Sequence, residues 1–252
     1  MSNPAWPLPF WIAHRGAGKL APENTLAAFR VGASHGYRAF ECDVKLSADG
    51  VPFLLHDTTL QRTTRERGIA AEREWRELSR LDAGAWHSRA FAGEPLTSFE
   101  AIAAYCLRNG FALNVEIKPT PGAEVLTGSV VAHEAARLWG GAAVPLLLSS
   151  FSVEALAAAQ AAEPHLSRAL LIDTLRTGWL DDALALGCAT IVANCGVLDA
   201  TVIGRIHDAG LRALTYTVND PATAHSLMDC GIDGIITDAI DRFSPVQPAV
   251  FD

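Results

Sequence analysis

The chain has 252 residues, half of them hydrophobic, and a formal net charge of −8. This length suits one α/β barrel or two smaller domains. An acidic chain without a basic patch argues against nucleic acid as the main partner, although a few local cations or a bound metal can still attract an anionic substrate.

Short aliphatic or β-branched runs recur along the whole chain, with helical patterns between most of them. The runs span residues 10–14, 39–44, 113–117, 146–149, 169–172, 190–193, 213–217 and 234–236. Repeated strand–helix units predict parallel strands joined by right-handed crossovers. We therefore expect a (β/α)8 TIM barrel that forms a single domain over residues 1–252. A doubly wound open sheet is the alternative, but Gly16 and Gly18 do not continue into a dinucleotide-binding pattern.

Several residues are typical of helix ends. Asp199 and Asp220 are predicted N-caps, and Asp220 precedes a proline, which is favoured at the first helical position. Thr97 and Glu100 have the spacing of a capping box. Glycines that favour the left-handed conformation of a helix C-terminus precede predicted strands at positions 36, 110, 187, 210 and 231.

One interval is too long for a single helix. After Val44, a turn at Asp49-Gly50 leads into a short run at residues 53–56, so Val44 and Phe53 are predicted to flank a hairpin. Residues 58–96 then form a predicted insertion after strand two, over one end of the barrel. Such a long segment is either a lid or substrate wall, or a packed surface excursion.

The cysteines and the N-terminus bear on location. The cysteine count is five, without a C-x-x-C pair and mostly in apolar surroundings, which is typical of reduced core residues. Residues 1–9 lack the basic residue and apolar run of a signal peptide, and no run approaches the roughly 18 apolar residues of a membrane span. We expect a soluble cytoplasmic protein without a membrane anchor, and the sequence carries no signal for its oligomeric state.

Charged and histidine side chains lie at the ends of the first predicted strands. They are His14, Arg15, Glu41, Asp43, His56, Glu116 and Lys118. Active sites of α/β barrels are built at the carboxyl ends of the strands. Because residues two apart on a strand face the same way, Glu41 and Asp43 share a face, as do Glu116 and Lys118.

Three converging carboxylates repel one another unless a cation lies between them. Oxygen ligands alone suit Mg²⁺ or Ca²⁺ better than zinc, so Glu41, Asp43 and Glu116 are candidate metal ligands. The alternative is that each acid forms an ordinary ion pair with Arg15 or Lys118.

The remaining residues of this group suit phosphate-ester chemistry. His14 and His56 can act as a general acid and a general base, whereas the other histidines are expected to be ordinary core or surface residues. Arg15 can clamp a phosphate through paired hydrogen bonds, and Lys118 can neutralise charge that develops in the transition state. The residues themselves therefore indicate metal-assisted cleavage of a phosphate ester.

Six short motifs occur in order along the chain. They are His14-Arg15-Gly16, Pro22-Glu23-Asn24-Thr25, Glu41-Cys42-Asp43, Leu55-His56-Asp57, Glu116-Ile117-Lys118-Pro119 and Thr217-Val218-Asn219. In these motifs, over about residues 11–242, the chain resembles the glycerophosphodiester phosphodiesterase family. Residues 18–25 and 82–84 most resemble the short cytoplasmic member linked to glycerol-phosphate uptake.

The resemblance implies a role for each candidate residue. It implies that Glu41, Asp43 and Glu116 hold a divalent metal ion. It also implies that His14 and His56 form the acid–base pair, and that Arg15 and Lys118 bind the phosphate. The implied reaction releases sn-glycerol 3-phosphate and an alcohol from small phosphodiesters such as glycerophosphocholine or glycerophosphoethanolamine. We favour His56 as the base and His14 as the acid, an order that the sequence leaves open.

One residue departs from the family pattern. Many relatives have tryptophan two positions before the valine of the last motif, where this chain has Tyr216. A tyrosine keeps an aromatic wall and adds a hydroxyl, so the resemblance implies a substrate-binding Tyr216 with an altered alcohol or glycerol pocket. The alternative is an aromatic residue of the barrel core.

Three other functions are less consistent with these residues. A lysophospholipase D acting on bulkier lipids would use Trp86 and Phe91 as an apolar wall. Amidohydrolase chemistry is disfavoured because the first strand would need two alternating histidines, whereas Arg15 and Gly16 follow His14. A non-catalytic barrel would be expected to lack an acid, a base or a metal ligand, and all of these residues are present.

Overall fold

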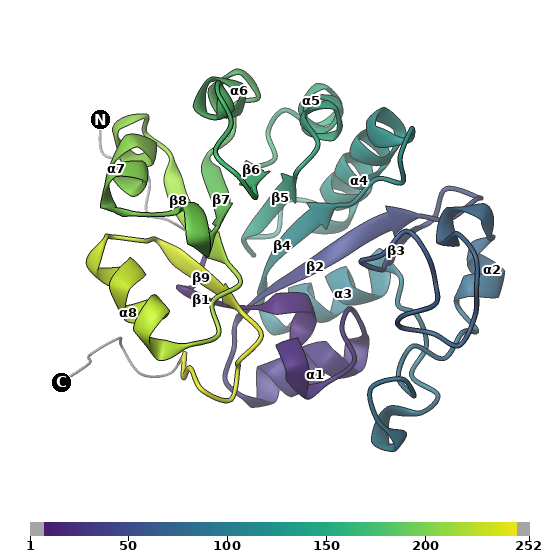
Figure 1. Ribbon diagram of the computed structural model, residues 1–252. Helices are drawn as coiled ribbons and strands as arrows, with labels where there is room; N and C mark the ends of the chain where they lie inside the picture. The colour runs from purple at the N-terminus through teal and green to yellow at the C-terminus, as the bar shows by residue number, and fades with distance from the viewer. Residues whose placement is uncertain (1–7, 246–252) are drawn as a thin grey trace.

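The computed structural model describes residues 8–245, and its strands surround a common centre with the helices outside them (Figure 1). Strand pairs follow chain order, and the first strand pairs in parallel with both the second and the last. This pairing closes the sheet, so the predicted TIM barrel is confirmed and an open doubly wound sheet is excluded. Residues 1–7, on which the prediction of a missing signal peptide mainly rests, lie outside the described part.

The strand boundaries agree with the predicted runs to within two residues. The barrel strands are β1 (Trp11–Ala13), β2 (Ala39–Leu46), β4 (Ala112–Ile117), β5 (Leu146–Ser150), β6 (Arg168–Ile172), β7 (Thr190–Asn194), β8 (Arg212–Tyr216) and β9 (Gly234–Thr237). The outer helices are α1 (Leu26–Ser34), α3 (Phe99–Asn109), α4 (Glu124–Trp139), α5 (Val153–Ala162), α6 (Trp179–Ala185), α7 (Ala200–Asp208) and α8 (Pro221–Asp229). The short strand β3 (Pro52–Leu54) runs antiparallel to β2 and completes the predicted hairpin.

Two apolar clusters lie on opposite sides of the barrel wall. The larger fills the space between strands and helices, and the smaller lies inside the barrel. On β2, for example, Ala39 belongs to the inner cluster and Phe40 to the outer one, as the alternation of a strand requires. Inward positions further along the same strand are Glu41 and Asp43, so the barrel interior changes from apolar to polar toward the carboxyl ends.

The helix N-caps are largely as predicted. Asp199 accepts a hydrogen bond from the Val202 amide at 2.8 Å, and Asp220 accepts one from the Thr223 amide at 2.8 Å. The capping box at Thr97 is wrong, because the N-cap of α3 is Ser98. The carbonyl of Thr97 accepts the amide of Leu54 at 2.9 Å, which keeps Thr97 extended beside β3 and delays the helix by one residue.

The segment 58–96 packs on a small apolar cluster of its own. It contains the 3-10 helices η3 (Ala70–Glu72) and η4 (Arg89–Phe91) and the short helix α2 (Trp75–Leu78). The cluster comprises Phe53, Leu55, Leu60, Ala70, Leu78, Ala83 and Leu96. The segment lies beyond β3 on the right of Figure 1, and Glu94 fastens it to α1 by accepting the Ala27 amide at 2.9 Å.

The cysteines are unpaired, as predicted. Cys42, Cys106 and Cys188 are buried, whereas Cys195 and Cys230 are partly exposed. The prediction of core positions therefore holds fully for three of them.

Gly18 lies in the loop after β1, where the chain passes close to Asp238. A Cβ at Gly18 would lie 2.1 Å from the Asp238 carbonyl oxygen, and the φ of Gly18 is +54°. Gly50 also has a positive φ, +78°, but a Cβ there would meet nothing within 4 Å. We expect Gly18→Ala to lower the free energy of unfolding by about 2–4 kcal/mol, and Gly50→Ala by about 1 kcal/mol.

Denaturant unfolding of the two variants measures this difference. Equal losses would mean that backbone conformation alone, rather than the close approach to Asp238, explains the glycine at position 18.

Candidate active site

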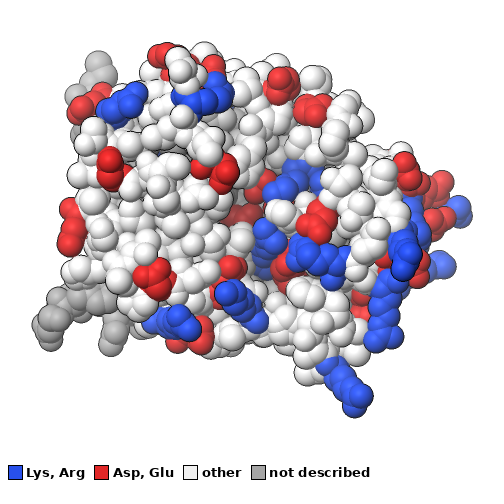
Figure 2. Space-filling view, viewed as in Figure 1, with Lys and Arg blue, Asp and Glu red and all other residues white. Residues whose placement is uncertain are grey.

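A cavity of about 200 Å³ opens at the carboxyl ends of the barrel strands. Lys, Arg, Asp and Glu side chains gather around a hollow near the centre of the face in Figure 2. The predicted site residues that line the cavity are His14, Arg15, Glu41, His56, Glu116, Lys118 and Tyr216. Trp86 and Phe91, the proposed apolar wall, are not among the described residues that line it.

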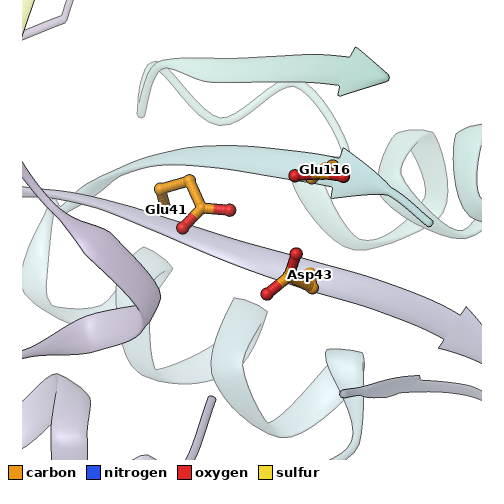
Figure 3. Close-up of side chains that lie close together, drawn as sticks. All are labelled: Glu41, Asp43 and Glu116. Carbon is orange, nitrogen blue, oxygen red and sulfur yellow. The ribbon is translucent and has the colours of Figure 1, made fainter. Parts of the chain in front are cut away.

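The three predicted metal ligands lie together. Glu41 and Asp43 on β2 and Glu116 on β4 stand on neighbouring strands (Figure 3), and Asp43 pairs in register with Glu116. One carboxylate oxygen from each lies within 4.8 Å of the others. Asp43 is 1 % exposed, so it forms the base of the cluster rather than part of the cavity surface.

The pKa values of the three carboxyl groups are shifted in different directions. Burial, together with the charge of Asp43, raises the pKa of Glu41 and the pKa of Glu116. Burial also opposes ionisation of Asp43, but the charges of Arg15 and Lys118 outweigh it and lower its pKa. The three carboxylates together therefore carry more negative charge than the neighbouring cations Arg15 and Lys118 neutralise.

Among the described residues, the alternative that each acid forms an ordinary ion pair with Arg15 or Lys118 holds for Asp43 and Glu116 but not for Glu41. Arg15 Nε lies 3.3 Å from Asp43 Oδ2, and Lys118 Nζ lies 3.3 Å from Asp43 Oδ1 and 2.8 Å from Glu116 Oε1. Glu41 has neither cation among its ion pairs within residues 8–245; its partners are the Arg15 backbone amide at 3.0 Å and His14 Nε2 at 3.7 Å. Two cations thus face three carboxylates.

Two residues in the left-handed region shape the loop after β1. Arg15 has φ +50° and Asn24 has φ +59°, and the Asn24 amide donates to the Arg15 carbonyl at 3.0 Å. Non-glycine residues rarely adopt this conformation, and it often occurs at functional sites. Here it directs the Arg15 amide at Glu41, while Asn24 holds Asp43 through two hydrogen bonds of 2.8 and 3.1 Å.

His14 is held by an acid at the end of β9. Its Nδ1 lies 2.6 Å from Asp238 Oδ1. Burial favours the neutral ring, but the hydrogen bond to Asp238 and the charge of Glu41 outweigh it and raise the pKa of His14. Asp238 in turn accepts from Asn219 Nδ2 at 3.3 Å, so the carboxylate that orients the ring is itself fixed.

A network of hydrogen-bonded ion pairs connects His56 with the segment 58–96. His56 Nδ1 lies 2.7 Å from Asp57 Oδ1, and Arg62 donates to both Asp57 oxygens at 2.7 and 3.0 Å. Arg62 also donates to both oxygens of Glu23 at 2.6 and 2.8 Å, and Glu23 accepts from Arg15 at 2.9 Å. The two residues His56 and Arg15 are therefore connected through Arg62.

The pKa of His56 is shifted in the opposite direction from that of His14. Burial lowers the pKa of His56, and the charge of Asp43 opposes this only in part. A neutral ring can accept a proton near neutral pH.

Tyr216 forms part of the cavity wall. Its hydroxyl donates to the Ile172 carbonyl at 3.3 Å, and its ring meets Phe151 edge-on at a centroid distance of 5.8 Å. Phe151 lines the same cavity and is 44 % exposed. The Tyr216 side chain is thus partly buried: it lines the cavity and also packs against the apolar cluster inside the barrel.

Sequence reasoning missed several residues of the site. They are Asn24, Asp57, Arg62, Asn114, Ser149, Phe151 and Asp238. Asp238 directly follows β9, so the rule that polar residues at strand ends form the site would have found it. Asp57 and Asn24 stand inside motifs already quoted, whereas Arg62 lies in the segment 58–96 and carries no local signal.

The chain is similar to known proteins in sequence and in structure. The sequence model of the glycerophosphoryl diester phosphodiesterase family matches residues 14–242. A glycerophosphodiester phosphodiesterase of Bacillus altitudinis is 30% identical over 244 residues, 92% of this chain and 95% of that protein.

Two solved structures are similar over nearly the whole chain. One is an Oleispira antarctica phosphodiesterase in complex with the product sn-glycerol 3-phosphate, with a TM-score of 0.87 and 32% identity over 93% of this chain and 95% of that one. The other is a glycerophosphodiester phosphodiesterase from Agrobacterium tumefaciens, with a TM-score of 0.76 and 27% identity over 95% of this chain and 100% of that one. The chain therefore belongs to the glycerophosphoryl diester phosphodiesterase family and is a phosphodiester hydrolase.

Proposed function

We propose that this enzyme hydrolyses small glycerophosphodiesters, such as glycerophosphocholine and glycerophosphoethanolamine, to sn-glycerol 3-phosphate and an alcohol. We further propose that it depends on a divalent cation, Mg²⁺ or Ca²⁺. The observation that carries the proposal is the convergence of Glu41, Glu116, two cations and two histidines at one cavity, with the Asp43 carboxylate buried beside the two glutamates. The product complex of the Oleispira antarctica phosphodiesterase supports the same reaction.

The carboxylate cluster fits a hard divalent cation. Its donors are all oxygen, and Asp43 Oδ1, which lies 3.3 Å from Lys118 Nζ, makes no hydrogen bond within residues 8–245. Glu41, Asp43 and Glu116 would hold the ion. When bound, the ion would polarise the phosphoryl oxygens and stabilise negative charge that develops there.

The two histidines have the properties of an acid–base pair. His56, whose pKa is lowered, suits the general base that takes a proton from the nucleophile. His14, whose pKa is raised, suits the general acid that gives a proton to the leaving alkoxide. Asp57 and Asp238 accept from Nδ1 of each ring, so Nε2 is the nitrogen that would face the substrate. In His14 this nitrogen also lies 3.7 Å from Glu41 Oε2.

Arg15, Lys118 and Tyr216 are proposed to bind the substrate. Arg15 and Lys118 bring positive charge to the cavity beside the acids, which suits a phosphodiester anion. Tyr216 and Phe151 form the aromatic side of the cavity and would contact the glycerol or alcohol moiety.

The same proposal covers organisation and location. We infer one catalytic domain over residues 1–252, with residues 58–96 as an insertion after strand two, and a cytoplasmic enzyme that binds no nucleic acid. Within residues 8–245, none of the helices has the length and apolar character that crossing a membrane requires.

Release of sn-glycerol 3-phosphate from glycerophosphocholine tests the function. The purified protein is assayed in Mg²⁺, in Ca²⁺ and after EDTA treatment. We expect release in at least one of the two metals and almost complete loss after EDTA, restored by adding the metal back. Release that persists unchanged in EDTA would contradict the metal dependence, and no release from folded protein would contradict the substrate class.

A further inference from the structure

Two neutral polar side chains that line the cavity find no hydrogen-bond partner among the described residues. Asn114 on β4 is 1 % exposed and Ser149 on β5 is 0 % exposed. Within residues 8–245, neither amide atom of Asn114 nor the hydroxyl of Ser149 makes a hydrogen bond. Both residues line the same cavity.

Buried polar groups without partners destabilise a folded protein, because they lose their hydrogen bonds to water and gain none in return. Two other inward positions that line the cavity are apolar, Leu171 on β6 and Ile236 on β9, whereas β2, next to β4, contributes Glu41. Apolar side chains are thus accommodated in the lining of this cavity. Asn114 and Ser149 therefore point to a ligand that supplies the missing hydrogen bonds.

The position of the pair suggests which part of a ligand it meets. In the strand register Asn114 is the partner of Glu41, and Ser149 is the partner of Glu116. The pair thus lies directly beside the carboxylate cluster. The cations Arg15 and Lys118 border the same cavity and provide the stronger attraction for an anionic group.

The chemistry of the pair suits hydroxyl groups. An amide and a hydroxyl each donate and accept hydrogen bonds without carrying charge, as does an alcohol. We propose that Asn114 and Ser149 form a hydroxyl-binding subsite that holds the glycerol hydroxyls of the substrate and so selects a polyol phosphate. This inference rests on the proposed function, since it assigns the glycerol end of the same substrate.

The test compares two ligands that differ only in hydroxyl groups. Binding of sn-glycerol 3-phosphate and of propyl phosphate, which lacks both hydroxyls, is measured by calorimetry with Mg²⁺ present throughout. We expect the wild type to bind glycerol 3-phosphate about 10-fold or more tightly than propyl phosphate. Asn114→Leu and Ser149→Ala should each remove most of that difference and change propyl phosphate binding by less than about 2-fold.

Thr190 on β7 provides a matched control. Its hydroxyl is buried and makes no hydrogen bond within the described residues, yet Thr190 does not line the cavity. Thr190→Val should leave the ratio of the two affinities unchanged. Thermal unfolding gives a second readout: without ligand, Asn114→Leu should keep or raise the Tm, because it removes an unsatisfied buried group.

The outcomes separate this inference from the proposed function. If both ligands bind wild type equally, or if the variants weaken both equally, the subsite is overturned even when glycerophosphocholine is hydrolysed. If the hydroxyl preference is present and lost in the variants while no substrate is hydrolysed, the subsite stands and the proposed reaction fails. A large fall in the Tm of ligand-free Asn114→Leu would assign Asn114 a structural role, and Ser149→Ala then decides the hydroxyl preference by itself.

Discussion

His56→Ala is expected to lower kcat for glycerophosphocholine by about 10²–10⁴-fold while the protein stays folded. His56 borders the cavity, and its Nδ1 is engaged by Asp57 at 2.7 Å, so the ring presents Nε2 as the acceptor for a proton. Alanine removes that acceptor and leaves the carboxylate cluster and both cations in place. Steady-state kinetics together with circular dichroism measure the loss and the fold.

The control for this variant is His133→Ala on α4, where the side chain is 61% exposed. It should retain wild-type turnover. Near wild-type turnover in His56→Ala would remove His56 from the proposed mechanism.

The pH profile of kcat/KM distinguishes a catalytic from a purely structural role of His56, because only a catalytic group sets a limb of the profile. Because burial lowers the pKa of His56, its ring stays neutral below the ordinary value of about 6.5, and the acidic limb should lie below that pH. Asp57→Asn removes an interaction that raises the pKa of His56, so the limb should move further toward acid while kcat falls. A limb that stays in place in this variant would contradict the assignment of His56 as the base.

Glu41→Gln is expected to weaken binding of Mg²⁺ and Ca²⁺ by about 100-fold or more. Two cations neutralise the three carboxylates only in part, and the substitution removes one of these carboxylates. Glutamine can still accept the Arg15 amide that now donates to Glu41 at 3.0 Å, so the loop after β1 should keep its conformation. Calorimetric titration with each metal measures the loss, and Glu100→Gln on the exposed face of α3 serves as the control.

Although Glu41→Gln should weaken metal binding, it should not lower the stability of the metal-free protein. Burial and the charge of Asp43 already raise the pKa of Glu41, which shows that its ionised form is costly in the folded protein. In EDTA, Glu41→Gln should therefore keep or raise the Tm. Unchanged metal affinity would exclude Glu41 from the ligand set, and a lower Tm in EDTA would mean that its charge supports the fold.

The fold class could be predicted from local patterns alone. Buried parallel strands appear as short apolar runs, and a glycine with a positive φ follows most of the intervening helices, as at Gly110 and Gly187. Repetition of this unit leaves few topologies other than a barrel. The capping box at Thr97 failed because pairing of its carbonyl with Leu54, a contact with a distant strand, outweighed the local spacing.

The position of polar side chains at the carboxyl ends of the strands follows from the sequence, since alternation along a strand is local and closure of a parallel barrel brings those ends together. The connections between these side chains depend on the tertiary structure. Asp238 reaches His14 across 224 positions, and Arg62 reaches Glu23 across 39, because closure of the barrel and packing of the segment 58–96 bring them together. The lack of partners for Asn114 and Ser149 likewise depends on every neighbour in space, which no local pattern records.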